Sequence, residues 1–218
     1  MAGVRARSRE EKGGLSPVKL IGISGSPSSR SKTLAAVETA VRHAAERHPA
    51  VEAEVLSLVD YDLVFCDGRD PSLYEGDTRR VIDKVVEADA LVVGTPIYRA
   101  TYTGILKNLF DLLPNDALLG KPVGLVATAG SDHHYLAIEH ELKPLVGFFQ
   151  AHALPGAVYA KNEHFDGGEL VDRGVIRELE KLAEAVVAFC ERQRGPLVGA
   201  SAPTIERRTP FETGEGES

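Results

Sequence analysis

Several residue types that mark particular protein classes are scarce in this chain. It has no tryptophan, one methionine and two cysteines, Cys66 and Cys190, which stand far apart in no metal or redox spacing. Such sparse cysteine use excludes a disulfide-stapled scaffold, and we expect two reduced, buried thiols in a cytoplasmic protein. No apolar run approaches the roughly 20 residues of a membrane span. The charged N-terminus lacks the apolar segment of a signal peptide.

Basic residues are also in deficit. The chain carries 25 Lys and Arg against 32 Asp and Glu, a formal net charge of −7, and no basic stripe, so we expect no nucleic-acid surface. Its 218 residues and 43% hydrophobic content fit one domain of ordinary size. We expect a disordered N-terminal arm over 1–17, a folded domain over 18–194 and a flexible tail over 195–218.

Two familiar nucleotide-binding motifs are missing as well. The dinucleotide fingerprint G-x-G-x-x-G is absent, because Gly22 and Gly25 are the only glycines near the first strand. The P-loop pattern also fails. Lys32-Thr33 resembles its end, but Ser26 and Ser31 occupy the positions of its two glycines.

A different phosphate-binding pattern is present over 18–34. A short apolar run breaks at Gly25-Ser26-Pro27, and an amphipathic helical pattern then begins, which predicts strand, small-residue loop and helix. Hydroxyls and two cations crowd this loop, where unpaired amides at a helix N-terminus favour an anion. Serine caps alone would explain fewer hydroxyls. We therefore interpret the loop as a cradle for a phosphate monoester, the group that flavin mononucleotide (FMN) carries.

Strand and helix patterns alternate along the rest of the chain. Strands are predicted at 18–24, 51–58, 90–96, 122–128 and 156–159, and helices at 34–47, 78–88, 104–113, 134–152 and 172–192. This alternation predicts an α/β fold with a five-stranded parallel sheet in the order 2-1-3-4-5 and helices on both faces.

Three loops then meet where such sheets bind ligands, outside the carboxyl ends of the strands. They are 25–33, 95–104 and 128–134, all rich in hydroxyls, glycine or aromatics. Tyr98 or Tyr102 could cover a planar ring, or both could simply fill the boundary between loop and helix. The pair His133-His134 suggests a metal, but adjacent residues point apart and no third ligand is placed by spacing, so no metal site is predicted.

The loops also carry the motifs of a known family. Residues 25–34 and 94–108 resemble the NAD(P)H-dependent FMN reductases of flavodoxin-like fold. Residues 118–123 and 142–144 are similar to the branch that supplies reduced flavin to two-component monooxygenases of the alkanesulfonate type. The likeness covers roughly 19–182.

This resemblance implies a cofactor site in three parts. The flavin phosphate would be bound by Ser26, Arg30, Ser31, Lys32 and Thr33. The edge and face of the ring would be lined by Pro96, Ile97, Tyr98 and Arg99, and its pyrimidine end by Ala129, Gly130 and Ser131. Hydride would pass from NADPH or NADH to flavin N5, so the family needs no catalytic side chain.

Partners and alternatives follow from the same resemblance. The family implies a homodimer or homotetramer and a separate flavin-dependent monooxygenase that receives reduced FMN. One alternative is a quinone or azo reductase that keeps its FMN. Another, from a different class, is a flavodoxin-like electron carrier that would not oxidise NAD(P)H.

One helical feature has its own physical reason. Pro144 lies inside the predicted helix 134–152, where its missing N–H leaves the carbonyl of His140 without a partner four residues on. Either a simple kink or a π-bulge around His140 would relieve this. In the branch that the chain resembles, this helix is a subunit-contact element. We therefore expect His140 in a π-bulge at an oligomer interface near the flavin.

Overall fold

A parallel sheet forms the centre of the molecule. The computed structural model describes residues 17–193. Its main sheet holds β1 (Val18–Ser24), β2 (Val51–Ser57), β3 (Ala90–Pro96), β4 (Pro122–Ala129), β5 (His152–Ala153) and β6 (Val158–Lys161). The order is β2-β1-β3-β4-β5, with β6 also paired to β4, and all of these pairs are parallel. The predicted order 2-1-3-4-5 is confirmed.

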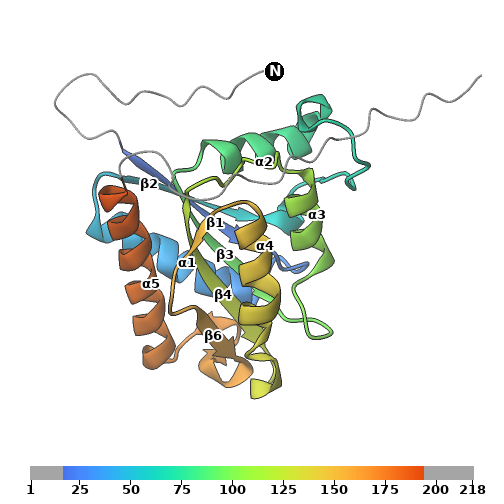
Figure 1. The fold of residues 1–218 in the computed structure, drawn as a ribbon. Helices are drawn as coiled ribbons and strands as arrows, with labels where there is room; N and C mark the ends of the chain where they lie inside the picture. Colours follow the sequence, from blue (N-terminus) through green and yellow to red (C-terminus); the bar gives the residue numbers. More distant parts are fainter. Residues whose placement is uncertain (1–16, 194–218) are drawn as a thin grey trace, which may run out of the picture.

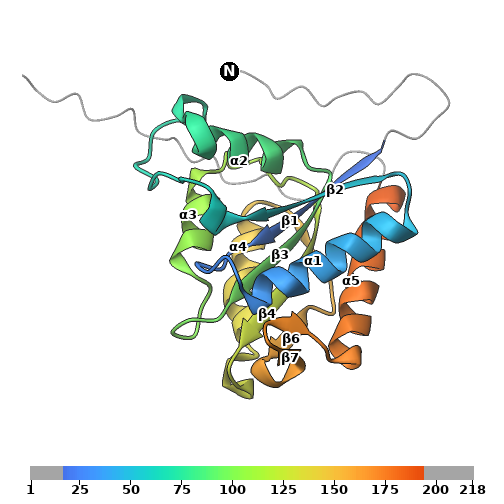
Figure 2. The same ribbon diagram turned by 180° about the vertical axis from the view of Figure 1, so that it is seen from behind.

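Helices cover both faces of this sheet (Figures 1 and 2). On one face lie α1 (Lys32–Arg47) and α5 (Arg173–Arg192), and on the other α2 (Gly76–Glu87), α3 (Gly104–Leu112) and α4 (Lys143–Phe148). Apart from residue 17, the predicted N-terminal arm lies outside the described residues, as does the predicted tail. No helix between residues 17 and 193 is long and apolar enough to cross a membrane.

The strands are buried on both sides, which gives two cores. In β1, Ile21 and Ile23 pack toward α2, α3 and α4, whereas Leu20 packs toward α1 and α5. Helix α1 lies very close to β1 at Gly22. A Cβ placed on Gly22 would come within 2.7 Å of side-chain carbons of Val37 and Val41 on α1. The sheet therefore fixes the position of α1 and of the loop that precedes it.

The last strand differs from its prediction over 156–159. It forms two short pieces, since β5 pairs with the start of β4 (Pro122↔His152) and β6 with its end (Val126↔Val158). Pro155 and Gly156 lie between β5 and β6. Pro155 has no N–H to donate to a neighbouring strand, and Gly156 has a φ of 81°. A small antiparallel pair, β7 (Phe165–Asp166) with β8 (Glu169–Leu170), follows and was not predicted.

The predicted helix 134–152 is also wrong in its extent. Residues Asp132–His134 form a 3₁₀ turn, Ile138–Leu142 a π-helix, and α4 ends at Phe148. Gln150 then has a left-handed φ of 53°, and His152 already belongs to β5. The helix therefore stops early to let the chain re-enter the sheet.

The π-bulge around His140 is confirmed. The N–H of His140 still donates to the carbonyl of Leu136 at 3.0 Å, four residues back, but the N–H of Lys143 donates to Ile138, five residues back. The proline at 144 thus shifts the bonding pattern and does not merely kink the helix. His140 is exposed in the single chain, so its place at an interface stays a prediction.

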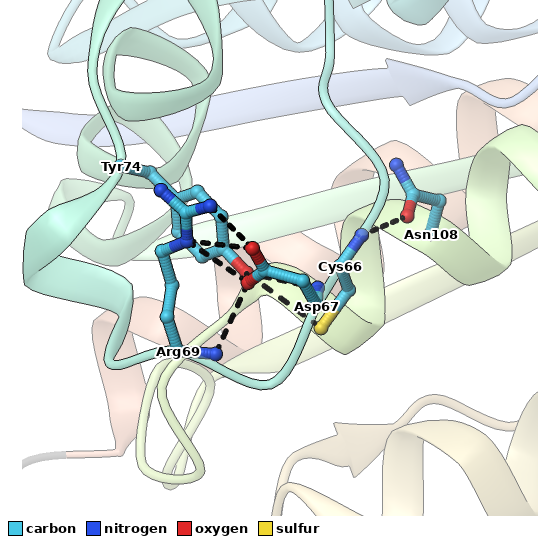
Figure 3. Close-up of polar contacts among 5 residues, drawn as sticks. All are labelled: Cys66, Asp67, Arg69, Tyr74 and Asn108. Atoms are coloured by element: carbon cyan, nitrogen blue, oxygen red, sulfur yellow. Dashed lines mark hydrogen bonds and ion pairs between the residues drawn. The ribbon is translucent and has the colours of Figure 1, made fainter. Parts of the chain in front are cut away.

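The loop between β2 and α2 is held by a side chain from α3 (Figure 3). Asn108 accepts a hydrogen bond from the N–H of Cys66 at 2.9 Å and donates one to the carbonyl of Val64 at 2.9 Å. Asn108 is itself buried. This bidentate contact gives a physical role to the asparagine that ends the second motif of the sequence.

Both cysteines are half-buried, so the expectation of buried thiols is wrong in degree. The thiol of Cys66 donates to the carbonyl of Asp111 at 3.2 Å. Beside it, the hydroxyl of Tyr74 donates to Asp67 at 3.1 Å, and burial raises the pKa of Tyr74 to about 12. Hydrogen bonds from Arg69 hold the pKa of Asp67 well below its usual range.

Candidate functional site

Hydrogen bonds join the three predicted loops at the carboxyl edge of the sheet. The hydroxyl of Thr103 donates to the carbonyl of Gly25 at 2.5 Å, and the hydroxyls of Thr33 and Thr128 lie 2.6 Å apart in a buried pair. The N–H of Ile97 donates to the carbonyl of Thr128 at 2.8 Å. Each loop is therefore bonded to another, and the three separate stretches of predicted site residues meet at this edge of the sheet.

The first loop is built around the start of α1. Ser31 is the N-cap, and its hydroxyl accepts from the N–H of Leu34 at 2.9 Å. The buried hydroxyl of Ser26 accepts from the N–H of Ser28 at 3.2 Å, so it shapes the loop. Arg30, directly before the N-cap, is exposed. The first turn of α1 has no acidic residue, and the helix dipole there favours an anion.

The second loop contains a tight, strained turn. The N–H of Tyr98 donates to the carbonyl of Thr101 at 2.9 Å, and the reverse bond is 3.2 Å long. Between them, Arg99 and Ala100 have φ values of 52° and 70°, a left-handed conformation that side chains disfavour. Ile97 is buried, whereas Tyr98 is 52% exposed. The Tyr98 ring is therefore accessible for a planar ligand to stack on it.

The third loop continues from the end of β4. Ala129 and Ser131 are half-buried and Gly130 is exposed. The carbonyl of Ser131 accepts from the hydroxyl of Tyr159 at 2.6 Å, and burial raises the pKa of Tyr159. His133 and His134 follow. Within residues 17–193 no group of three His, Cys, Asp or Glu side chains could hold a metal ion.

A fourth segment, residues 162–165, lies beside the first and third loops. The sequence did not single it out. The ammonium of Lys32 donates to the side-chain oxygen of Asn162 at 2.9 Å and lies 5.7 Å from the centre of the Phe165 ring. The amide nitrogen of Asn162 would be 3.6 Å from a Cβ on Gly130. Lys32 therefore sits between the loop and this segment. No motif in the sequence pointed to Asn162.

The carboxyl ends of β1 and β2 each hold a buried hydroxyl. Ser24 and Ser57 end β1 and β2 and are partners in register. Their hydroxyls have no hydrogen-bond partner within residues 17–193, which is rare for buried groups. The N-terminus of α1, which has no acidic residue in its first turn, and the hydroxyls and cations of the first loop suit a phosphate monoester. The residues present thus fit the phosphate end of FMN.

Comparisons with known proteins agree with this geometry. Residues 18–166 match the sequence model of a family described as NADPH-dependent FMN reductase. An NAD(P)H-dependent FAD/FMN reductase of Geobacillus thermodenitrificans is 46% identical over 171 residues, which cover 78% of this chain and 92% of that protein. The NADH-dependent FMN reductase SfnF of Pseudomonas putida is 34% identical over 174 residues, covering 80% and 94%.

Solved structures show the same architecture. The apo form of an NADH:FMN oxidoreductase, EmoB, superposes with a TM-score of 0.64 at 29% identity and covers 80% of this chain and 89% of that one. An archaeal flavodoxin covers 80% of this chain and 100% of its own, with a TM-score of 0.55 at 14% identity, which shows the fold alone. The flavodoxin-like fold is confirmed.

Proposed function

This chain belongs to the NADPH-dependent FMN reductase family, and we propose that it works in the cytoplasm and supplies reduced FMN to a separate flavin-dependent monooxygenase. The protein is an NAD(P)H-dependent oxidoreductase that uses FMN. Bound FMN would supply the hydride acceptor for the nicotinamide, at its N5. The reduction itself therefore requires no catalytic side chain, and the residues of the chain serve to hold and align the flavin.

In this proposal the phosphate end of FMN is held by Ser26, Arg30, Ser31, Lys32 and Thr33. The ring lies against Pro96, Ile97, Tyr98 and Arg99, with its pyrimidine end near Ala129, Gly130 and Ser131. The buried Thr33–Thr128 pair supports this assignment, because it ties the phosphate loop to the third loop at a fixed distance. Such alignment is what brings two rings to hydride-transfer distance.

The single observation that carries release of the flavin is the exposure of the rim. Tyr98, Arg99, Arg30 and Gly130 are all exposed, so the proposed ring site opens to solvent. A flavin held there can exchange, as a reductase that hands on its product requires. A quinone or azo reductase, the remaining alternative, would keep its FMN and bring the acceptor to it. The electron-carrier alternative is set aside, because the relatives are named as reductases.

Steady-state kinetics test this proposal. We expect NADH or NADPH oxidation by the purified protein to depend on added FMN and to saturate with it, with substoichiometric FMN in the protein as isolated. Adding a flavin-dependent monooxygenase should then consume the reduced FMN across a dialysis membrane. Stoichiometric FMN that stays bound through turnover, with electrons passed to quinone or azo acceptors, would contradict it.

We propose further that the π-helix face joins copies of the chain in a homodimer or homotetramer. His140 is exposed in the π-helix, Leu136 just before it and Phe148 at the end of α4. Between α3 and α4 lies a cavity of about 380 Å³ that is lined largely by apolar residues, Phe148 among them. Exposed apolar side chains such as Leu136 and Phe148 beside such a hollow are typical of an association surface.

Sedimentation analysis measures this association. The unmodified protein should sediment at a multiple of its 23.4 kDa chain mass, and Phe148→Glu should shift it toward the single chain. Leu73→Glu, at an apolar position before α2 that is somewhat more exposed than Phe148, is the matched control and should leave the mass unchanged. A monomeric unmodified protein would contradict the proposal.

A further inference from the structure

The turn at the ring side of the site needs outside support. Both of its central residues, Arg99 and Ala100, have left-handed φ values of 52° and 70° although neither is glycine. Turns of this kind normally carry glycine, asparagine or aspartate there, because other side chains disfavour the conformation. A strained turn persists only where the surrounding structure holds it.

One side chain from outside the loop bonds to the last residue of this turn. The hydroxyl of Thr101 donates to Oε2 of Glu141 at 3.1 Å. Among residues 17–193, no other side-chain hydrogen bond is made by the side chains of the four turn residues, 98–101. The base of the loop is fixed separately, since Thr103 bonds to Thr95 and to Gly25. Besides the two backbone bonds between Tyr98 and Thr101, the turn is therefore held by Glu141.

The π-helix places Glu141 at this contact. Ile138 and Leu142 are buried against the core, whereas Glu139 points outward and pairs with Lys143 at 2.6 Å. Glu141 is half-buried and faces the turn. Two glutamates two positions apart thus have different environments. Because an extra residue per turn changes which residues share a face, the bulge sets the direction in which Glu141 points.

We propose that Glu141 is a positioning residue for the flavin ring. It holds the Tyr98–Thr101 turn in the strained conformation against which the ring lies, and so couples the π-helix to the geometry of hydride transfer. This inference rests on the proposed flavin site but not on the release of reduced FMN. It concerns the ring end of the cofactor, so it predicts equal effects on flavins with and without the phosphate.

Equilibrium binding of oxidised flavin tests the proposal apart from turnover. Glu141→Ala should weaken FMN and riboflavin by the same factor, about tenfold, as loss of a hydrogen bond to a charged group should. Thr101→Val removes the other partner, should have the same effect, and should add little to Glu141→Ala in the double variant. Glu141→Gln keeps an oxygen acceptor and should retain most of the affinity.

Glu139→Ala is the matched control, since it removes an exposed ion pair from the same helix and should leave flavin affinity unchanged. Thermal melting of each variant separates positioning from loss of the fold. Unchanged flavin affinity in folded Thr101→Val and Glu141→Ala, or full additivity of the two, would overturn the proposal. FMN retained through turnover would overturn only the release function, because this binding measurement does not depend on it.

Discussion

Gly94→Ala should destabilise the protein and weaken FMN binding together. A Cβ on Gly94 would lie 2.4 Å from Cγ2 of Val37 and 3.0 Å from Cγ2 of Thr33, and Val37 is fully buried. The start of α1 would have to move off β3, which costs about 1–3 kcal/mol for an overpacked core. The same movement displaces Thr33 from Thr128. Urea denaturation and FMN titration measure the two effects.

Two further variants make this expectation specific. Gly147→Ala, at an exposed helical position with nothing within 4 Å of the added carbon, should leave stability unchanged or raise it by up to about 1 kcal/mol. Combining Gly94→Ala with Val37→Ala removes the closest clash and should restore FMN binding in part. Wild-type stability and affinity in Gly94→Ala alone would show that α1 does not seat against β3 as described.

Arg30→Ala should have the largest effect on phosphate recognition. Loss of a charge-assisted contact to the FMN phosphate should weaken FMN by about 1–3 kcal/mol, or roughly 5- to 150-fold in dissociation constant. Riboflavin has no phosphate, so its affinity should be unchanged. Fluorescence titration with both flavins gives the ratio of the FMN and riboflavin dissociation constants for each protein. Raising the salt concentration should reduce the difference in FMN affinity between the variant and the unmodified protein, because salt screens the charge of Arg30.

The control for Arg30→Ala is an arginine on α1, the helix that follows the first loop. Arg42 is exposed on α1 and pairs with Glu46 at 4.0 Å, about two and a half turns from the first loop. Arg42→Ala should leave both flavin affinities unchanged. If Arg30→Ala keeps the FMN affinity of the unmodified protein, Arg30 does not contact the phosphate and the phosphate is held without it.

Much of the fold was predictable because its signals are local. Residues 90–96 form β3 with the predicted bounds, since a continuous apolar run flanked by polar residues fits a strand buried on both faces. The start of α1 was placed two residues late, at 34 in place of Lys32. The cap at Ser31 and the polar first turn hide the beginning of the amphipathic pattern.

The errors come from tertiary context. The apolar pattern of 134–152 suits one helix, but the end of that segment has to pair with β4 at Pro122 and Val123, and the helix stops at Phe148. The π-bulge was predictable because Pro144 removes a specific donor. Asn162 was missed because its contact with Lys32 joins positions 130 residues apart, and no spacing rule reports such a pair.

Paired titrations of the unmodified protein with FMN and with riboflavin test the central claim most directly. That claim is a phosphate cradle at the start of α1, formed by 25–33 and joined to the ring-side loops. We expect saturable binding of FMN that is at least about tenfold tighter than that of riboflavin, as charge-assisted phosphate contacts require. Equal affinity for the two flavins, or no FMN binding at all, would contradict the account.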